Sequence, residues 1–291
     1  MSDGLRDPLR SVDGAAVGAF IAYAAARIVA PYVPIEPTRP TDVALTVGFV
    51  VLALYVSARI AYAERHSFAT EAIACALSVG VFVAFALILV PVTRGHWAVV
   101  AVADLVQLVA AVSAGVVLSR VVREAKLLPA LIVTVAVVDV VGVLYGGPVS
   151  QAMQSNPDLV AKFSQRIPEA GSKTRPSEPG GMPEVQYVGT AGIGDLLFTA
   201  FFFACVGRFA LDYRRTLGTT LVLGSLGMLI ALVSGSPMPA LPFLAVGVLV
   251  VNRRHFHYTR EEKTALAVAS VFLVAFCLLM VYLTRRLQTG A

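Results

Sequence analysis

The stretch "VGTAGIGDLLFTAFFF", residues 188–203, places one carboxylate, that of Asp195, between two glycines and a long apolar run. An ionisable side chain is costly where its neighbours favour a lipid environment. The role of Asp195 therefore depends on whether the chain spans a membrane and on whether this carboxylate has a partner.

The composition of the chain is that of a membrane protein. Of its 291 residues, 57% are hydrophobic and 14% charged, and its mean hydropathy is +0.79. Soluble globular domains contain roughly 45–50% apolar and about 25% charged residues. We predict an all-α polytopic membrane protein with about nine transmembrane helices, since apolar stretches long enough to cross a bilayer recur along the chain. The candidate segments cover residues 13–34, 42–63, 71–91, 96–119, 127–147, 188–212, 216–234, 236–251 and 263–284.

We predict a single membrane domain over residues 1–291, because the one sizeable polar insertion, residues 148–187, is followed directly by further apolar segments. Its stretch "EAGSKTRPSEPGGMPE", residues 169–184, is rich in Pro, Gly and Ser, which is typical of flexible chain. Residues 1–126 form the N-terminal helices, residues 127–212 a helix pair joined by the insertion, and residues 213–291 the C-terminal helices.

The basic residues indicate a membrane orientation rather than a nucleic-acid partner. They fall between the apolar segments, and short loops on one side carry most of them. The positive-inside rule then predicts a cytoplasmic N-terminus and an external 148–187 loop. His255 and His257 have no matching cluster of further ligands nearby, so we expect no metal site.

A second carboxylate, Asp139, lies in the apolar stretch "LIVTVAVVDVVGVLYGG", residues 131–147. Asp139 is about eight residues before the outer end of its segment and Asp195 about eight after the outer start of the next, which at about 1.5 Å per residue puts both about 12 Å below one surface. Consecutive antiparallel helices could therefore bring the two carboxylates face to face.

Two carboxylates in a low-dielectric site cannot both ionise comfortably, so one holds a proton near neutral pH. Such a pair can activate a water molecule and protonate a developing oxyanion, as in peptide hydrolysis. Each Asp could equally belong to a proton or ion pathway of a transporter. Gly192 and Gly194 fit a site that another backbone approaches closely. The two aspartates alone leave protease and transporter equally open.

A third element, "SGSPMPALPFL", residues 234–244, begins the short eighth segment. Pro237, Pro239 and Pro242 prevent a regular helix there. Non-helical backbone at membrane depth is tolerated only beside protein or a watery cavity. This stretch therefore predicts unpaired backbone groups that line an internal site.

An intramembrane Asp, a GxGD motif and a Pro-Ala-Leu motif, in this order, closely resemble the presenilin and signal peptide peptidase family of GxGD intramembrane aspartyl proteases. In this chain the elements are Asp139, then Gly192-Ile193-Gly194-Asp195, then Pro239-Ala240-Leu241. The local flanks "DVVGVLYGGPVSQAM" and "MPALPFL" are also similar to presenilin segments. The resemblance covers roughly residues 127–250.

The resemblance implies an enzyme that hydrolyses peptide bonds within transmembrane helices, with Asp139 and Asp195 as the catalytic pair. The residues around the second Asp and the Pro-Ala-Leu motif would shape the site and hold the unwound substrate as an added strand. These residues are Gly192, Ile193, Gly194, Leu196, Pro239, Ala240 and Leu241. No metal or organic cofactor is implied. The expected partners are substrate helices and the lipid bilayer, with no nucleic acid.

The chain departs from the family pattern in three respects. Val138 stands where the family usually has Tyr. Four predicted segments precede the Asp139 helix, where the family usually has five, and one segment follows the Pro-Ala-Leu helix, where the family usually ends. An external 148–187 loop matches signal peptide peptidase rather than presenilin, which favours signal peptides or type II anchors as substrates.

The small size and compact loops indicate a prokaryotic plasma-membrane protein and thus a prokaryotic presenilin homologue. Two alternatives remain open: a proton- or ion-coupled transporter that uses the two aspartates as relay sites, and an inactive relative that binds membrane helices without cutting them.

Two further polar residues, Asp104 and Gln107, lie in the fourth apolar segment. Intramembrane polar groups usually face other helices, so we expect Asp104 to be hydrogen-bonded within the bundle. Arg27, near the outer end of the first segment, is expected to extend to the interface.

Overall fold

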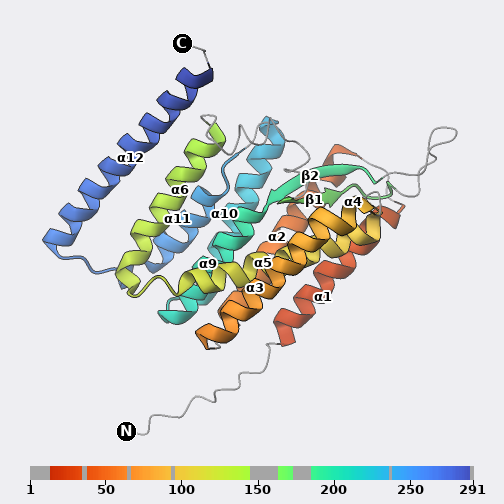
Figure 1. Cartoon of the computed structure of the whole chain (residues 1–291), viewed down its shortest axis with the longest axis horizontal. Coiled ribbons are helices and arrows are strands. Elements are labelled where there is room, and N and C mark those ends of the chain that lie inside the picture. The colour runs from red at the N-terminus through yellow and green to blue at the C-terminus, as the bar shows by residue number, and fades with distance from the viewer. Residues whose placement is uncertain are drawn as a thin grey trace, which may run out of the picture.

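The computed structural model describes residues 14–34, 38–63, 67–92, 96–144, 163–172, 185–235 and 238–288. These residues form a helical bundle with one two-stranded sheet at one end (Figure 1). The helices are α1 (Gly14–Val29), α2 (Arg39–Ala63), α3 (Phe68–Ala84), α4 (Val90–Val92), α5 (Trp97–Ser119), α6 (Leu128–Leu144), α9 (Ile193–Arg208), α10 (Tyr213–Ser234), α11 (Leu241–Asn252) and α12 (Arg260–Gln288), and the strands are β1 (Ser164–Pro168) and β2 (Tyr187–Gly192).

The prediction of an all-α polytopic membrane protein is confirmed. Within the described ranges, seven helical segments are long and apolar enough to cross a membrane. Two of the nine predicted segments are shorter: α9 has 16 residues and α11 has 12. The prolines before α11 explain its late start, and the late start of α9 has a different cause.

The segment predicted as a helix over residues 188–212 begins as a strand instead. β2 occupies Tyr187–Gly192 and pairs antiparallel with β1, with Ser164 opposite Gly192. Glycine has a low helix propensity, and Thr190 is β-branched, so this stretch fits a strand better than a helix. The prediction of unbroken helix was wrong here. β1 lies in the polar insertion just before residues 169–184, the stretch predicted as flexible chain; within the insertion, residues 148–162 and 173–184 lie outside the described ranges.

The short helix α9 forms the centre of the bundle. Its middle and C-terminal residues are buried, including Phe202 and Phe203, which are fully buried. Helices α5 and α2 pack along it, as Figure 1 shows. The α5–α9 crossing is close because Gly115 has no side chain: a Cβ atom there would lie 2.8 Å from the Ala200 Cβ atom and from the Phe201 backbone nitrogen. The site that α9 carries is therefore held on a rigid, buried element.

Helices α6 and α12 lie at one side of the bundle (Figure 1). Only Leu128 and Ile132, near the start of α6, are buried on that helix. α6 packs against α11 and α12, and it makes no extensive contact with α9. Exposed apolar side chains such as Phe272 cover α12, as expected for a helix that faces lipid.

Arg27 of the first segment and Asp104 of the fourth lie against one another. Asp104 forms a buried ion pair with Arg27, which confirms that Asp104 is bonded within the bundle. Arg27 is fully buried, so the expectation that it extends to the interface was wrong. The reason is the partner: a buried carboxylate on the facing helix holds the guanidinium inside.

We expect Gly115→Ala to lower the free energy of unfolding by about 1–3 kcal/mol, because the added methyl group overlaps the backbone of α9. The matched control is Gly48→Ala on α2, where a Cβ atom meets nothing within 4 Å. That change should be neutral or stabilise by up to about 1 kcal/mol through helix propensity. The melting temperatures of both variants in detergent test this, and equal values would contradict a close α5–α9 crossing.

Candidate active site

The Asp195 side chain lies at the junction of β2 and α9. Asp195 is in the first turn of α9, and Gly192 is the N-cap residue with φ −70° and ψ 140°. The Asp195 carboxylate accepts a hydrogen bond from the Gly192 backbone N–H. A residue at the third helical position that bonds back to the N-cap amide forms half of a capping box. Asp195 is thus near the helix start, rather than about two turns inside a helix as the sequence predicted.

The two glycines of the GxGD motif differ in their surroundings. A Cβ atom at Gly192 would lie 3.3 Å from Oδ2 of Asp195, whereas one at Gly194 would meet nothing within 4 Å. The backbone of Gly192 is extended and suits any residue, so the glycine is needed for space rather than for conformation. The absence of a side chain at Gly192 lets the carboxylate lie against the backbone.

Asp139 lies in the C-terminal half of α6, beyond the two buried residues near the start of this helix. Its side chain is half-buried, and Oδ2 accepts a hydrogen bond of 3.0 Å from the Leu241 backbone N–H. Leu241 is the first residue of α11. The N–H groups of a first helical turn have no partner within the helix, and Pro242 has no N–H at all. The Pro-Ala-Leu motif therefore offers a backbone donor to Asp139.

The two carboxylates are close enough for their charges to interact. They do not meet through direct packing of α6 on α9, as the sequence predicted. Instead α11 packs against both helices and bridges them. The structure thus brings Asp139, Asp195 and Leu241 together, from three segments that are far apart in the chain.

The other predicted site residues lie at or near the starts of α9 and α11. Leu196 is 1% exposed and belongs to the main core, and Ile193 packs beside Phe82 and Ala110. Pro239 is buried and Ala240 is the N-cap residue of α11. Leu196, Ile193 and Pro239 therefore fix the starts of α9 and α11 through packing.

Val138 and Pro237 were singled out in the sequence for different reasons. Val138 is 54% exposed on α6, so the position where the family has Tyr points outward here. Pro237 lies outside the described residues.

Both carboxylates also have an ordinary structural interpretation as helix caps. Each lies at a helix N-terminus, where the helix dipole favours an anion. Serine, threonine and asparagine cap helices as well, however, and they bring no charge into an apolar bundle. Capping alone therefore explains the hydrogen bonds but not the choice of two carboxylates that interact with one another.

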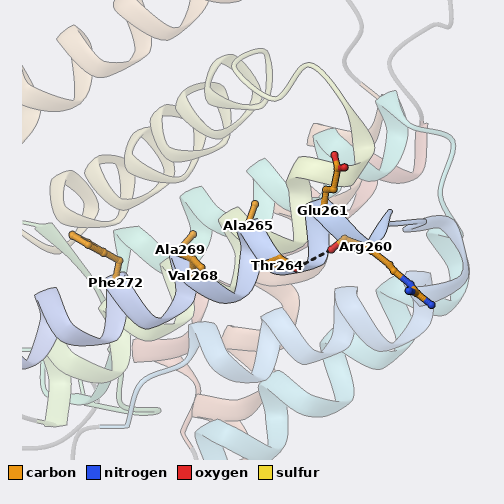
Figure 2. A pocket seen from close by; sticks show the side chains of 7 residues that line it. All are labelled: Arg260, Glu261, Thr264, Ala265, Val268, Ala269 and Phe272. Carbon is orange, nitrogen blue, oxygen red and sulfur yellow. Dashed lines mark hydrogen bonds between the residues drawn. The ribbon is translucent and has the colours of Figure 1, made fainter.

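A hollow on the surface of α12 is a separate feature (Figure 2). Arg260 and Glu261 lie at one end of it, and Ala265, Ala269 and Phe272 form its apolar wall. Neither Asp139 nor Asp195 lines it. Besides the charges at its end, the hollow offers only the hydroxyl of Thr264, which donates to the Arg260 carbonyl of the same helix.

Comparisons of the chain with protein-family models, with curated proteins and with solved structures find no match. Among the described residues, no group of three His, Cys, Asp or Glu side chains could hold a metal ion. The function must therefore be inferred from the chemistry of the Asp139–Asp195 site.

The sequence predicted unpaired backbone groups in the 234–244 stretch, and the Leu241 N–H is one of them, but it did not predict that this N–H donates to Asp139. A pattern of residue types predicts which side-chain groups are present, and a backbone N–H is not a side-chain group. The signal was nevertheless present, since prolines at 239 and 242 predict a helix that starts between them, with free N–H groups in its first turn.

We expect Gly192→Ala to lower any activity that depends on Asp195 by about three- to tenfold, because a shift of a few tenths of an ångström already weakens catalytic geometry. Gly194→Ala is the matched control and should stay within about twofold of the wild type, since its methyl group enters open space and catalytic geometry is kept. The cleavage rate of a labelled transmembrane peptide measures this. An equal loss in both variants would contradict the asymmetry between the two glycines.

Proposed function

We propose that the protein is an intramembrane aspartyl protease of the GxGD type, related to presenilin and signal peptide peptidase. The observation that carries the proposal is the meeting of Asp139, Asp195 and the Leu241 N–H at the interface of α6, α9 and α11. All three motifs of the resemblance take part in it. A chance arrangement of polar residues has no reason to join these motifs.

The chemistry needs one ionised and one protonated carboxylate. The ionised group takes a proton from a water molecule as the water oxygen attacks the carbonyl carbon of the scissile peptide bond, and the protonated group donates to the carbonyl oxygen. The tetrahedral intermediate then collapses: the C–N bond breaks, the nitrogen takes a proton, and a new carboxyl and a new amine result. The pair titrates as a unit, so neither role is assigned to one residue.

The Leu241 and Gly192 N–H groups give this pair a defined geometry. Each donates to one carboxylate, so each side chain is held in position before substrate arrives. Preorganised donors of this kind cost no reorganisation during the reaction. The Pro-Ala-Leu motif is thus proposed to orient Asp139 directly through its backbone.

The substrate is proposed to be a transmembrane helix that unwinds at the site. Unwound backbone needs hydrogen-bond partners within the membrane. Among the described residues β2 pairs with β1 only, and β2 leads directly into Asp195. An extended substrate segment added beside β2 would run toward the carboxylates. The orientation expected in a prokaryotic plasma membrane, with the 148–187 loop outside, favours signal peptides and type II anchors as substrates.

We expect Asp139→Asn and Asp195→Asn each to lower the cleavage of a labelled transmembrane peptide by about 10²–10⁴-fold, because each removes one acid–base partner. Asparagine can still accept the N–H bonds from Leu241 and Gly192, so both variants should fold. The control is Asp212→Asn at the N-cap of α10, where Asn caps equally well.

An inhibitor that mimics the tetrahedral intermediate should block the wild type in the same assay. If the wild type cuts no peptide across a range of pH while Asp139→Asn alters proton flux into vesicles, the protease is wrong and the transporter is favoured. If neither cleavage nor flux is found, the inactive relative is favoured.

A further inference from the structure

Beside the sheet, a buried polar cluster joins α1, α5 and β1. Its members are Tyr23 and Arg27 of α1, Asp104 of α5 and Gln165 of β1, which are between 0% and 6% exposed. Arg27 forms an ion pair with Asp104. The proposed catalytic chemistry uses none of these residues.

The cluster forms hydrogen bonds to both the backbone and a side chain of β1. Arg27 donates to the backbone carbonyl of Arg166. The Tyr23 hydroxyl donates to Oε1 of Gln165 at 2.6 Å, and Nε2 of Gln165 donates to the Asp104 carbonyl at 2.8 Å. Both ends of the Gln165 amide are thus bonded, so two consecutive strand residues are tied to two different helices.

The strand pairing carries this constraint to the proposed active site. In the β1–β2 register, Gln165 lies opposite Ala191 and Ser164 opposite Gly192. Gly192 is the N-cap of α9 and donates to the Asp195 carboxylate. The path from the ion pair to Asp195 therefore passes through the hydrogen bonds to β1, the β1–β2 strand pairing and the hydrogen bond from Gly192 to Asp195.

Stability alone is a weak reason for this cluster. Two charges lose their hydration on burial, and replacing a buried ion pair by apolar side chains of similar size is often neutral or stabilising. Here the guanidinium is not even satisfied, since Nε and Nη1 of Arg27 have no partner among the described residues. What the pair provides, and apolar side chains do not, is the directed bond from Arg27 to the β1 backbone.

We infer that the Arg27–Asp104 pair is a positioning device that holds the β1–β2 sheet in register with α5 and thereby sets the place of Asp195. The inference rests on the proposed function, because it assigns to the pair a role in peptide cleavage. Arg27, Asp104, Tyr23 and Gln165 act through the sheet and do not touch the reacting atoms.

The test is the double variant Arg27→Met/Asp104→Leu, which replaces the charges by apolar side chains of similar size. We expect kcat for a labelled transmembrane peptide to fall roughly 10- to 100-fold, because displacing a catalytic group by about 1 Å costs this much. KM and the melting temperature should change little. Amide hydrogen exchange in residues 185–196 should become about tenfold faster, as β2 opens more readily.

The matched control is a second ion pair at the C-terminal end of α5, in which the C-cap residue Arg120 donates to Glu71 of α3 at 2.8 Å. It joins two helices but does not contact the strands. Glu71→Leu/Arg120→Met should leave kcat and the exchange of residues 185–196 within about twofold of the wild type, since it leaves the β1 contacts intact.

If the Arg27→Met/Asp104→Leu protein does not fold, Tyr23→Phe serves instead, because it removes a single hydroxyl bond to Gln165. It should speed exchange and lower kcat about threefold, in keeping with one lost hydrogen bond.

The two readouts separate this inference from the proposed function. Unchanged kcat and unchanged exchange in a folded Arg27→Met/Asp104→Leu protein overturn the positioning role, and so does an equal loss of kcat in the control pair. If the wild type cuts nothing, the protease proposal fails, and exchange then decides whether the pair holds β2.

Discussion

The structure depends on one constraint: a carboxylate inside an apolar bundle must find hydrogen-bond donors there. Helix N-termini supply such donors, because the N–H groups of the first turn have no partner within the helix. Asp139 takes the Leu241 N–H at the start of α11, and Asp195 takes the Gly192 N–H at the start of α9. Two helices therefore begin inside the bundle, beside these carboxylates. This is why α9 and α11 are short, and why prolines precede one and a glycine-containing strand precedes the other.

Helices that start inside an apolar bundle leave non-helical backbone that must be covered by protein. β1 covers β2 by pairing with it, and α5 and α2 enclose α9. Glycines make the close packing possible: besides Gly115 at the α5–α9 crossing, a Cβ atom at Gly247 of α11 would lie 2.9 Å from the Thr220 hydroxyl of α10. Small residues at helix crossings let backbones approach in this way. The site is thus supported by tightly packed helices on one side, while α6 closes it from the edge of the bundle.

Much of this architecture could be predicted from the sequence, and the failures have a common cause. Hydropathy located the helices, and the prolines correctly marked α11 as irregular at its start. The stretch 188–203 reads as one apolar run, so β2 was missed: its strand partner lies in a polar insertion that hydropathy assigns to loop. Arg27 and Asp104 are 77 positions apart, and Asp139 and Leu241 are 102 apart. Pairings at such separations, one of them to a backbone amide, leave no local pattern in a single sequence.

Four carboxylates inside this bundle differ in their partners, and the difference bears on function. Asp104 and Glu71 each face an arginine, so their charges are compensated within the fold. Among the described residues, Asp139 and Asp195 have no such cation: each accepts a hydrogen bond from a backbone amide, and their like charges repel. A carboxylate whose role is structural gains from a fixed cation, whereas a carboxylate that must exchange protons is hindered by one, because the cation holds it ionised. The lack of a cation beside Asp139 and Asp195 in the described part of the chain therefore fits the acid–base role proposed for this pair.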